Sequence, residues 1–352
     1  ALKLNGTGTM QKEGLALTEK KKAILLTKEE HNAKRVYDDS IISKLNECYD
    51  LYETVICKNN IKNHLSACKN AEYIFSTWGM EHFDENEIKK YFPNAKCLFY
   101  SAGSVQHFAK EFLNCNIRAF SAWKANAVPV AEYTYAQILL ALKGFYQASI
   151  HTKKHYYKMS KYAGNCGGIY NAKVGIIGVG SIGGMVAEKL KANDVEVYYY
   201  DPYLPEDIAN SLNIKSYTLE EIFKECDVIT NHLANKEELT GILSEKLFDM
   251  MKPYATFINT GRGKQVDEKG LVKAMKRVKT RTALLDVLCR EPLNPFSPIA
   301  RCKNIIVTPH IAGSLGNEVV RMAEYMTDEA QRIDNGELPL YEVTFEMLKT
   351  MA

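Results

Sequence analysis

The sequence predicts an α/β protein built from two doubly wound parallel sheets. Three observations carry this prediction. Strand-like apolar runs alternate with helix-like segments along most of the chain, the pattern of a parallel sheet covered on both faces. The length of 352 residues corresponds to about two domains of ~150 residues each. A GxGxxG turn joins a strand to a helix near residue 178, as in a doubly wound sheet.

Four short apolar runs in the first third of the chain are typical of strands, and segments with apolar residues at helical spacing separate them. The expected strands cover residues 22–27, 71–77, 96–101 and 118–121, and the expected helices cover residues 40–51, 61–70, 86–92 and 105–114. Strict alternation of strand and helix implies that neighbouring strands are parallel.

A long apolar helix is expected at about residues 131–154, and a second series of strands follows it. The six expected strands cover residues 172–179, 195–200, 227–232, 255–259, 282–287 and 304–308. With helices between them, these strands make a second doubly wound sheet. A last helix, at 317–335, follows the sixth strand, so we expect it to cross back to the first domain.

The composition argues against several classes of protein. Lys and Arg number 45 against 42 Asp and Glu, and this net charge of +3, without a basic stripe, disfavours a nucleic-acid partner. The expected long helix carries Glu132 and Lys143, so it falls short of the roughly 20 uncharged residues of a membrane span. No membrane association is therefore expected.

The nine cysteines are far apart and never form a CxxC pair. Their odd number and spacing favour reduced thiols over a disulfide framework or a zinc site. We therefore expect a cytoplasmic protein without a bound metal. Residues 1–19 are polar, with no apolar signal-peptide core, and are expected to form a loose tail.

The glycines of the GxGxxG turn are Gly178, Gly180 and Gly183. In this motif the first glycine permits a tight turn, the second lets the backbone approach a pyrophosphate, and the third lets the helix pack close to the strand. The anion would then lie at the N-terminus of the helix. The motif alone is weak, but a strand leads into it and an amphipathic helix leaves it.

The next strand ends at Asp201, 18 residues after Gly183, close to the ~20 residues that a dinucleotide site requires. A carboxylate here accepts hydrogen bonds from the adenosine ribose, and its charge repels a 2′-phosphate. NAD is therefore favoured over NADP. The alternative is that Asp201 only forms a turn before Pro202.

Arg262, Glu291 and His310 each come a few residues after one of the last three expected strands. The carboxyl ends of parallel strands meet at one edge of a sheet, where open α/β sheets bind their ligands. A guanidinium matches a carboxylate as a planar fork, and a histidine beside a carboxylate exchanges protons near neutral pH. Singly, each residue is more often ordinary loop surface; together, they could bind a 2-oxo acid and protonate its carbonyl.

These motifs resemble those of the D-isomer-specific 2-hydroxyacid dehydrogenase family, over about residues 71–313. The resemblance implies a Rossmann NAD-binding domain, residues 126–313, inserted into a flavodoxin-like substrate-binding domain, residues 20–125 completed by 314–352. It also implies an NAD-dependent enzyme that reversibly reduces a small 2-oxo acid to a D-2-hydroxy acid.

The resemblance assigns roles to individual residues. Arg262 should hold the substrate carboxylate and carbonyl, His310 should be the acid/base, and Glu291 should pair with His310. Asp286 should accept a hydrogen bond from the nicotinamide carboxamide. The backbone N–H groups of the loop after the strand expected at 96–101 should clasp the carboxylate. The remaining expected contacts are Ala102, Gly103 and Ser104 for the substrate, and Ser181, Ile182, His232, Thr260, Gly261 and Gly313 for the cofactor.

Two segments resemble parts of the family that move or associate. Residues 126–132 are similar to the hinge between its two domains, and the helix after them is similar to one used for dimerisation, so a homodimer is expected.

The chain departs from the family where it reads His232-Leu-Ala instead of His-x-Pro, which puts NAD affinity in doubt. His232 is expected to be structural rather than catalytic, since it lies on the nucleotide side. Relatives that oxidise formate carry Gln where Glu291 stands, which disfavours formate.

Two alternative functions stay open at this point. The chain could be an NAD(H)-sensing interaction protein similar to the transcriptional corepressors of this fold. It could also act on a phosphorylated acid, like a 3-phosphoglycerate dehydrogenase, which would need additional cations. Lys89, Lys90 and Lys110 are near in sequence, although a solvated face explains them better.

Side-chain selectivity should come from the first-domain loops at 76–80 and at Ser101. Trp78 and Met80 could form walls for an apolar group of the substrate, or Trp78 could belong to the core.

Overall fold

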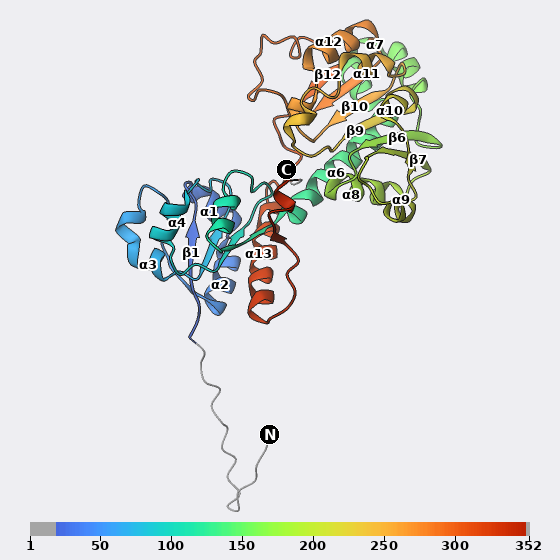
Figure 1. Cartoon of the computed structure of the whole chain (residues 1–352). Helices are drawn as coiled ribbons and strands as arrows, with labels where there is room; N and C mark the ends of the chain where they lie inside the picture. The colour runs from blue at the N-terminus through green and yellow to red at the C-terminus, as the bar shows by residue number, and fades with distance from the viewer. Residues whose placement is uncertain (1–18, 350–352) are drawn as a thin grey trace, which may run out of the picture.

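The computed structural model describes residues 19–349 and contains two β-sheets in two lobes (Figure 1). This confirms the predicted fold class. The chain passes between the lobes at the start of helix α6 (Trp123–Leu142) and again before helix α13 (Glu318–Asp334). The predicted tail, residues 1–19, lies outside the described residues except for Glu19.

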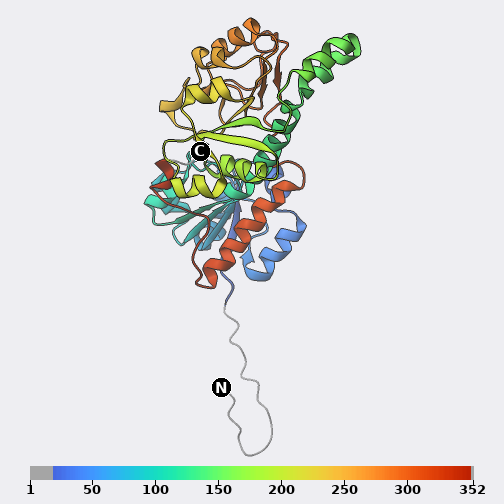
Figure 2. The same ribbon diagram turned by 90° about the vertical axis from the view of Figure 1, so that its right-hand side faces the viewer.

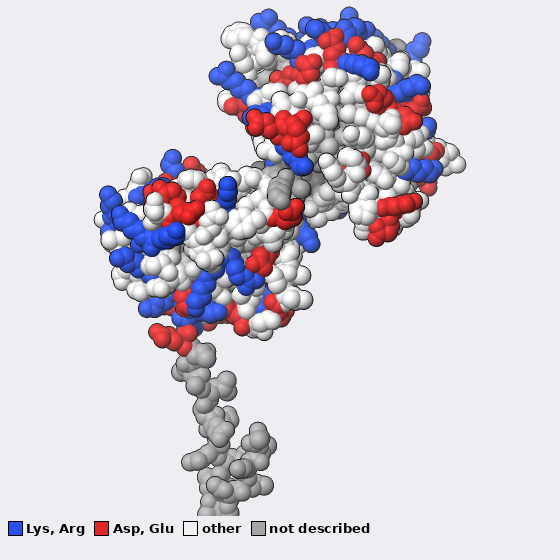
Figure 3. Space-filling view, viewed as in Figure 1, with Lys and Arg blue, Asp and Glu red and all other residues white. Residues whose placement is uncertain are grey.

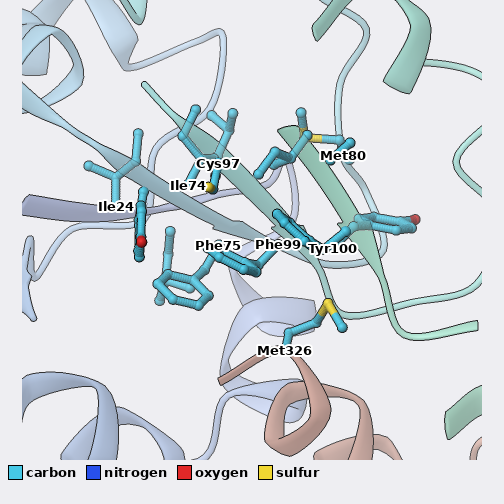
Figure 4. Close-up of a cluster of buried hydrophobic side chains, with 14 of the residues drawn as sticks. Ile24, Ile74, Phe75, Met80, Cys97, Phe99, Tyr100 and Met326 are labelled. Carbon is cyan, nitrogen blue, oxygen red and sulfur yellow. The ribbon is translucent and has the colours of Figure 1, made fainter. Parts of the chain in front are cut away.

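The sheet of the first lobe has the strand order β13-β5-β4-β3-β1-β2, and β13 alone runs antiparallel to its neighbour. Its inner strands are apolar runs because helices cover both faces. Figure 4 shows Phe75 and Phe99 on the face toward Met326 of α13. Their ring centroids are 5.1 Å apart. The strands are β1 (Lys22–Leu26), β2 (Asp50–Leu51), β3 (Tyr73–Ser76), β4 (Cys97–Tyr100), β5 (Arg118–Ser121) and β13 (Glu342–Val343).

Short helices between these strands cover the first sheet. Asp84 begins one of them with a capping box, in which its side chain accepts from the Glu87 N–H and the Glu87 side chain accepts from the Asp84 N–H. The helices are α1 (Glu30–Val36), α2 (Asp39–Cys48), α3 (Leu65–Asn70), α4 (Glu85–Tyr91) and α5 (Ala109–Asn114), with 3₁₀ turns η1 (Ile61–His64) and η4 (Met347–Lys349).

The second lobe contains a parallel sheet with the order β12-β11-β10-β9-β6-β7-β8. Strand β6 lies between β7 and β9, so the strand order reverses beside it, and the ligand of an open α/β sheet binds at such a point. The strands are β6 (Ala172–Ile177), β7 (Val195–Tyr200), β8 (Lys215–Ser216), β9 (Val228–Asn231), β10 (Thr256–Asn259), β11 (Thr282–Leu285) and β12 (Ile305–Val307).

The helices that link these strands pack on both faces of the second sheet. They are α8 (Ser181–Leu190), α9 (Glu206–Leu212), α10 (Leu219–Glu225), α11 (Glu245–Met250) and α12 (Glu268–Arg277), with 3₁₀ turns η2 (Glu237–Leu239) and η3 (Gly263–Gln265).

The single long helix expected at 131–154 is wrong, because two helices occupy this region. Helix α6 ends at Leu142, and α7 (Phe145–Gly164) begins after Gly144. Gly144 has φ +67°, a left-handed conformation that ends a helix readily. Helix α7 has a kink at His155 and projects from the body of the molecule (Figure 2).

The last helix returns to the first lobe, as predicted. Helix α13 packs against α1, α2 and the start of α6. Near its end, Asp334 accepts hydrogen bonds from the hydroxyls of Tyr49 and Tyr73 at 2.8 and 2.6 Å. The C-terminal segment therefore completes the packing of the first sheet.

Figure 3 shows basic and acidic side chains interspersed over the visible face of both lobes. Within residues 19–349, none of the helices has the length and apolar character needed to span a membrane.

Candidate active site

The glycine turn follows β6 and leads into α8. A Cβ atom on Gly178 would lie 2.8 Å from the carbonyl oxygen of His232, and one on Gly183 would lie 2.1 Å from the carbonyl oxygen of Gly178. A Cβ on Gly180 would meet nothing within 4 Å. Two glycines thus allow close packing, and the third faces open space at the N-terminus of α8, beside Ser181 and Ile182. This arrangement fits a pyrophosphate.

Asp201 follows β7 and points its carboxylate at this turn. Its Oδ2 accepts the Val179 N–H at 2.8 Å, and its Oδ1 accepts the Tyr203 N–H at 3.0 Å. The second bond forms the local turn that was the alternative hypothesis for Asp201. Each carboxylate oxygen can still accept one more hydrogen bond, so both roles are compatible.

His232, after β9, has a neutral imidazole. Burial lowers its pKa to about 3. Its Nε2 lies 3.0 Å from the Thr230 hydroxyl, and its buried Nδ1 has no hydrogen-bond partner among the described residues. The ring therefore contacts its own strand. These contacts test neither the structural role nor the cofactor contact expected for His232, and both stay predictions.

Thr260 and Gly261 follow β10 and are both buried. The Thr260 hydroxyl lies 3.0 Å from that of Thr134 on α6, and a Cβ on Gly261 would lie 3.0 Å from Asn231 Nδ2. Their side-chain positions are thus taken up by packing, so any contact they make with a cofactor would use the backbone.

Arg262 and Glu291 are brought together by two tightly packed loops. A Cβ on Gly263 would lie 1.9 Å from the carbonyl carbon of Leu288, so only glycine fits where these loops meet. Arg262 is half-buried, and its Nη1 donates to the Gly261 carbonyl at 2.9 Å. Burial lowers the pKa of Arg262, and the charge of Glu291 opposes this shift.

Glu291 accepts from two donors. Its Oε1 lies 3.0 Å from the Leu288 N–H nitrogen, and its Oε2 lies 3.0 Å from His310 Nδ1. Burial alone would raise its pKa, but the bonds from Leu288 and His310 and the charges of His310 and Arg262 outweigh burial and lower the pKa. An ionised carboxylate can only accept, so Nδ1 of His310 carries a proton. Nε2 is then the atom that can exchange a proton with a ligand.

The backbone of His310 is in the left-handed region, with φ +55°. Such a conformation is costly for a residue with a side chain and needs support from its surroundings. Asp286 supplies the support: its carbonyl accepts the His310 N–H at 3.0 Å, its Oδ1 accepts from Ile311 at 2.9 Å, and its Oδ2 accepts from Ala312 at 2.9 Å.

No pattern in the sequence indicates this use of Asp286, which was expected to bind the nicotinamide carboxamide. The Thr308 hydroxyl also donates to Oδ1 at 2.6 Å. With three donors already on its carboxylate, Asp286 has room for about one more hydrogen bond. Binding of the carboxamide by Asp286 remains a prediction.

The expected substrate loop follows β4. The Ala102 N–H donates to the Tyr100 carbonyl at 2.9 Å, and the Ser121 hydroxyl donates to the carbonyls of Ala102 and Gly103 at 2.9 and 2.7 Å. Of the three N–H groups expected to clasp a carboxylate, that of Ala102 is therefore already used. The N–H groups of Gly103 and Ser104 remain as candidates.

Asn126, in the first turns of α6, links the two lobes. Its Oδ1 accepts the Ser314 N–H at 3.2 Å, and its Nδ2 would lie 3.5 Å from a Cβ on Gly103. A Cβ on Gly313 would lie 3.5 Å from the same Oδ1. The substrate loop and the segment after His310 thus meet at one side chain. Asn126 lies in the segment expected to be a hinge, but no pattern in the sequence assigns it an individual role.

The proposed walls of the substrate pocket have different environments. Trp78 is half-buried, and the Arg35 guanidinium lies 5.8 Å from its ring centroid. Met80 is buried, with its Sδ 3.2 Å from the Ser76 hydroxyl, and belongs to the core. Trp78 also packs against the core of the first lobe, so both interpretations of Trp78 stay open, and the wall roles of Trp78 and Met80 stay predictions.

The lysines considered for a phosphorylated substrate have other contacts. Lys89 pairs with Glu85 on its own helix at 3.6 Å, and Lys90 lies 5.0 Å from the ring centroid of Tyr91. Lys110 is exposed on α5. These environments favour the solvated-face interpretation. Across residues 19–349, no group of three or more His, Cys, Asp or Glu side chains is arranged to hold a metal ion.

Comparison with known proteins gives one family. The model of the "D-isomer specific 2-hydroxyacid dehydrogenase, NAD binding domain" matches residues 135–312. A glyoxylate reductase of Korarchaeum cryptofilum is 30% identical over 221 residues, 62% of this chain and 67% of that protein. A D-3-phosphoglycerate dehydrogenase of Archaeoglobus fulgidus is 32% identical over 189 residues, which covers 54% of this chain but 36% of that longer protein.

A solved structure shows the same fold over nearly the whole chain. It is the NAD-complexed D-isomer specific 2-hydroxyacid dehydrogenase of Lactobacillus delbrueckii ssp. bulgaricus, with a TM-score of 0.74 and 20% identity. The match covers 92% of this chain and 100% of that one.

Proposed function

Because the chain belongs to the D-isomer-specific 2-hydroxyacid dehydrogenase family, an oxidoreductase family with an NAD-binding domain, we propose that it reduces a small 2-oxo acid to the D-2-hydroxy acid, reversibly and with NADH. The observation that carries this proposal is the hydrogen bond between His310 Nδ1 and Glu291 Oε2, beside the half-buried guanidinium of Arg262. This bond leaves Nε2 of a correctly oriented imidazole for proton transfer.

The chemistry divides between the cofactor and the side chains. A bound NADH would supply the hydride. Arg262 would bind the substrate carboxylate and stabilise negative charge on the carbonyl oxygen, an effect that partial burial strengthens. His310 would donate a proton from Nε2 to that oxygen, and Glu291 would stabilise the imidazolium and fix the ring. The N–H groups of Gly103 and Ser104 would hold the other end of the carboxylate.

The test is a panel of 2-oxo acids, including glyoxylate, pyruvate and hydroxypyruvate, assayed by NADH oxidation. His310→Ala and Arg262→Ala should each lower kcat/KM by on the order of 10²- to 10⁴-fold. Arg301→Ala, which replaces an exposed arginine, serves as the control and should retain parental activity. Parental activity in either site variant would refute the assignment. NADH binding without turnover of any 2-oxo acid would favour the corepressor-like alternative.

We propose NAD rather than NADP as the cofactor. The support is Asp201, whose carboxylate lies beside the glycine turn with acceptor capacity left on both oxygens. A ribose 2′-hydroxyl could donate to it, whereas a 2′-phosphate would be repelled. Running the substrate panel with both NADH and NADPH tests this choice.

We also propose a homodimer in which α6 and α7 form the interface. Helix α7 projects from the lobe and exposes Phe145, Ile150 and Tyr157. Large apolar side chains exposed on a projecting helix are favourably covered by a partner, and a two-fold axis lets each copy cover the other. Light scattering on the parent and on Ile150→Glu tests this; a parent that is monomeric at assay concentration would contradict it.

The cytoplasmic location remains a prediction from the cysteines.

A further inference from the structure

We propose that Tyr133, on α6, is a positioning residue for His310 and acts through Thr308 and Asp286. This inference rests on the proposed function, because it assumes that proton transfer by His310 is the step to be served. None of the hydrogen bonds described above joins Tyr133 to Arg262, Glu291 or His310. Its effect would come through the loop that carries His310.

The hydrogen bonds fix a direction from Tyr133 to Asp286. The Thr308 hydroxyl lies 2.6 Å from Asp286 Oδ1 and 3.0 Å from the Tyr133 hydroxyl. Asp286, when ionised, can only accept, so the single proton of Thr308 is donated to it. The Thr308 oxygen must then accept from Tyr133. Removal of the Tyr133 hydroxyl therefore takes away the donor to the Thr308 oxygen in this series of hydrogen bonds.

The environment of Tyr133 keeps this donor in place. Burial raises the pKa of the Tyr133 hydroxyl, so it stays protonated at any ordinary assay pH. Tyr133 borders an apolar pocket of about 320 Å³ between α6 and strands β11 and β12, which Tyr146, Leu285, Thr308 and Ile311 also line. Hydrogen bonds are stronger in such a low-dielectric environment than in water.

The loop needs support because His310 is in the left-handed region, and Asp286 holds it on both sides. Thr308 precedes His310 by two residues, and Ile311 and Ala312 follow it; all three donate to the Asp286 carboxylate. A Thr308 hydroxyl without its donor can rotate away from Oδ1. Segment 308–312 would then sample other backbone conformations, and Nε2 of His310 would spend less time where a substrate oxygen can reach it.

The experiment compares Tyr133→Phe with Tyr146→Phe. Both changes remove one hydroxyl from the same pocket, but the Tyr146 hydroxyl takes no part in the hydrogen bonds to Thr308. We expect Tyr133→Phe to lower kcat about fivefold, the factor that one neutral hydrogen bond is worth. NADH affinity, measured by fluorescence, and the melting temperature should stay near parental values, and Tyr146→Phe should keep the parental kcat.

Thr308 offers an independent test of the same chain. Thr308→Ser keeps the hydroxyl and should keep most of the activity, whereas Thr308→Val removes it and should lose at least as much kcat as Tyr133→Phe. Adding Tyr133→Phe to Thr308→Val should cost nothing more, because the two residues act in series. Parental kcat in Tyr133→Phe, or full additivity in the double variant, would overturn the inference.

A readout without turnover separates this inference from the proposed function. In protein labelled with ¹⁵N-histidine, the signal assigned to His310 by its absence from His310→Gln should shift or broaden in Tyr133→Phe and not in Tyr146→Phe. If the parent turns over no 2-oxo acid but the His310 signal responds, the proposed function fails and the positioning role stands. If the parent is active and neither kcat nor the signal responds, only the positioning role fails.

Discussion

Gly183 lies so close to Gly178 that a Cβ atom on Gly183 would be 2.1 Å from the Gly178 carbonyl oxygen. Gly183→Ala must therefore displace α8 from β6, and we expect it to lower the free energy of unfolding by about 1–3 kcal/mol. Gly180→Ala is the matched control, because a Cβ there meets nothing within 4 Å.

The two variants should separate stability from cofactor binding. Gly180→Ala should keep the parental melting temperature without ligand but bind NADH more weakly, since its methyl group occupies the face that a pyrophosphate approaches. Thermal unfolding and NADH fluorescence titration measure the two effects. Equal loss of stability in both variants, or parental NADH affinity in Gly180→Ala, would contradict this account of the turn.

Replacement of Glu291 should lower the rate of the reaction. The lowered pKa of Glu291 keeps it ionised at neutral pH, so one carboxylate oxygen accepts from the Leu288 N–H and the other from His310 Nδ1. The amide of Glu291→Gln has a single oxygen, so it cannot accept both bonds in this way, and the imidazole loses its fixed orientation. The maximal rate should fall on the order of 10- to 100-fold. Steady-state assays of the parent and the variant at neutral pH measure this, and a parental rate would exclude the role of Glu291.

Asp201→Asn should narrow the preference for NAD over NADP. The amide keeps the size of the side chain, but it removes the charge that would repel a 2′-phosphate. NADH should bind about 5- to 10-fold more weakly if one charged hydrogen bond to the ribose is lost, and use of NADPH should increase. The exposed Asp207→Asn, on α9, is the control. A ratio of kcat/KM for NADH to NADPH equal to that of the parent would contradict this role.

His232 should make the cofactor-free protein less stable in acid. Its pKa is about 3 when folded, because of burial, and about 6.5 when unfolded. Between these values only the unfolded state binds the proton, so the free energy of unfolding falls as pH drops below 6.5. At pH 5 the loss relative to pH 7.5 should reach about 2 kcal/mol.

Urea unfolding of the parent and of His232→Gln at pH 7.5 and pH 5 measures this loss. The variant should show a smaller decrease between the two pH values, by the amount attributed to His232. His155→Gln, which replaces an exposed histidine, should behave as the parent does. A parent and a His232→Gln variant with the same pH dependence would show that the buried ring is protonated without cost.

The strands were predictable because parallel strands covered on both faces are apolar runs. The strands expected at 118–121 and 195–200 are β5 and β7 with the same bounds, and the other long strands differ by at most two residues at either end. The edge strands β2, β8 and β13 were missed, because two residues show no periodicity. The division of the long helix was missed as well, since a single glycine, Gly144, inside an apolar pattern does not reveal its φ angle.

The site residues were identifiable from their place after strands, but their contacts were not. That His310 Nδ1 meets Glu291 depends on how the loop after β11 folds back, which no spacing encodes. Asp286 holds the His310 loop, and the Ala102 N–H donates to Tyr100, because of the directions in which backbone N–H groups point in the folded chain. Those directions cannot be read from the sequence. The position of Asn126 between Gly103 and Ser314 depends on how the two lobes are arranged. Such contacts between distant segments leave no local pattern.

The return of α13 and β13 to the first sheet has a consequence for synthesis of the protein. All strands of the second sheet lie in one continuous stretch, from β6 to β12, so that lobe can acquire its native packing while the ribosome is still at work. The first sheet must wait for its edge strand at 342–343. The first lobe, although its strands β1 to β5 are made before the second sheet, is thus the last to be completed, and it is the lobe in which premature termination would leave an unpaired strand edge.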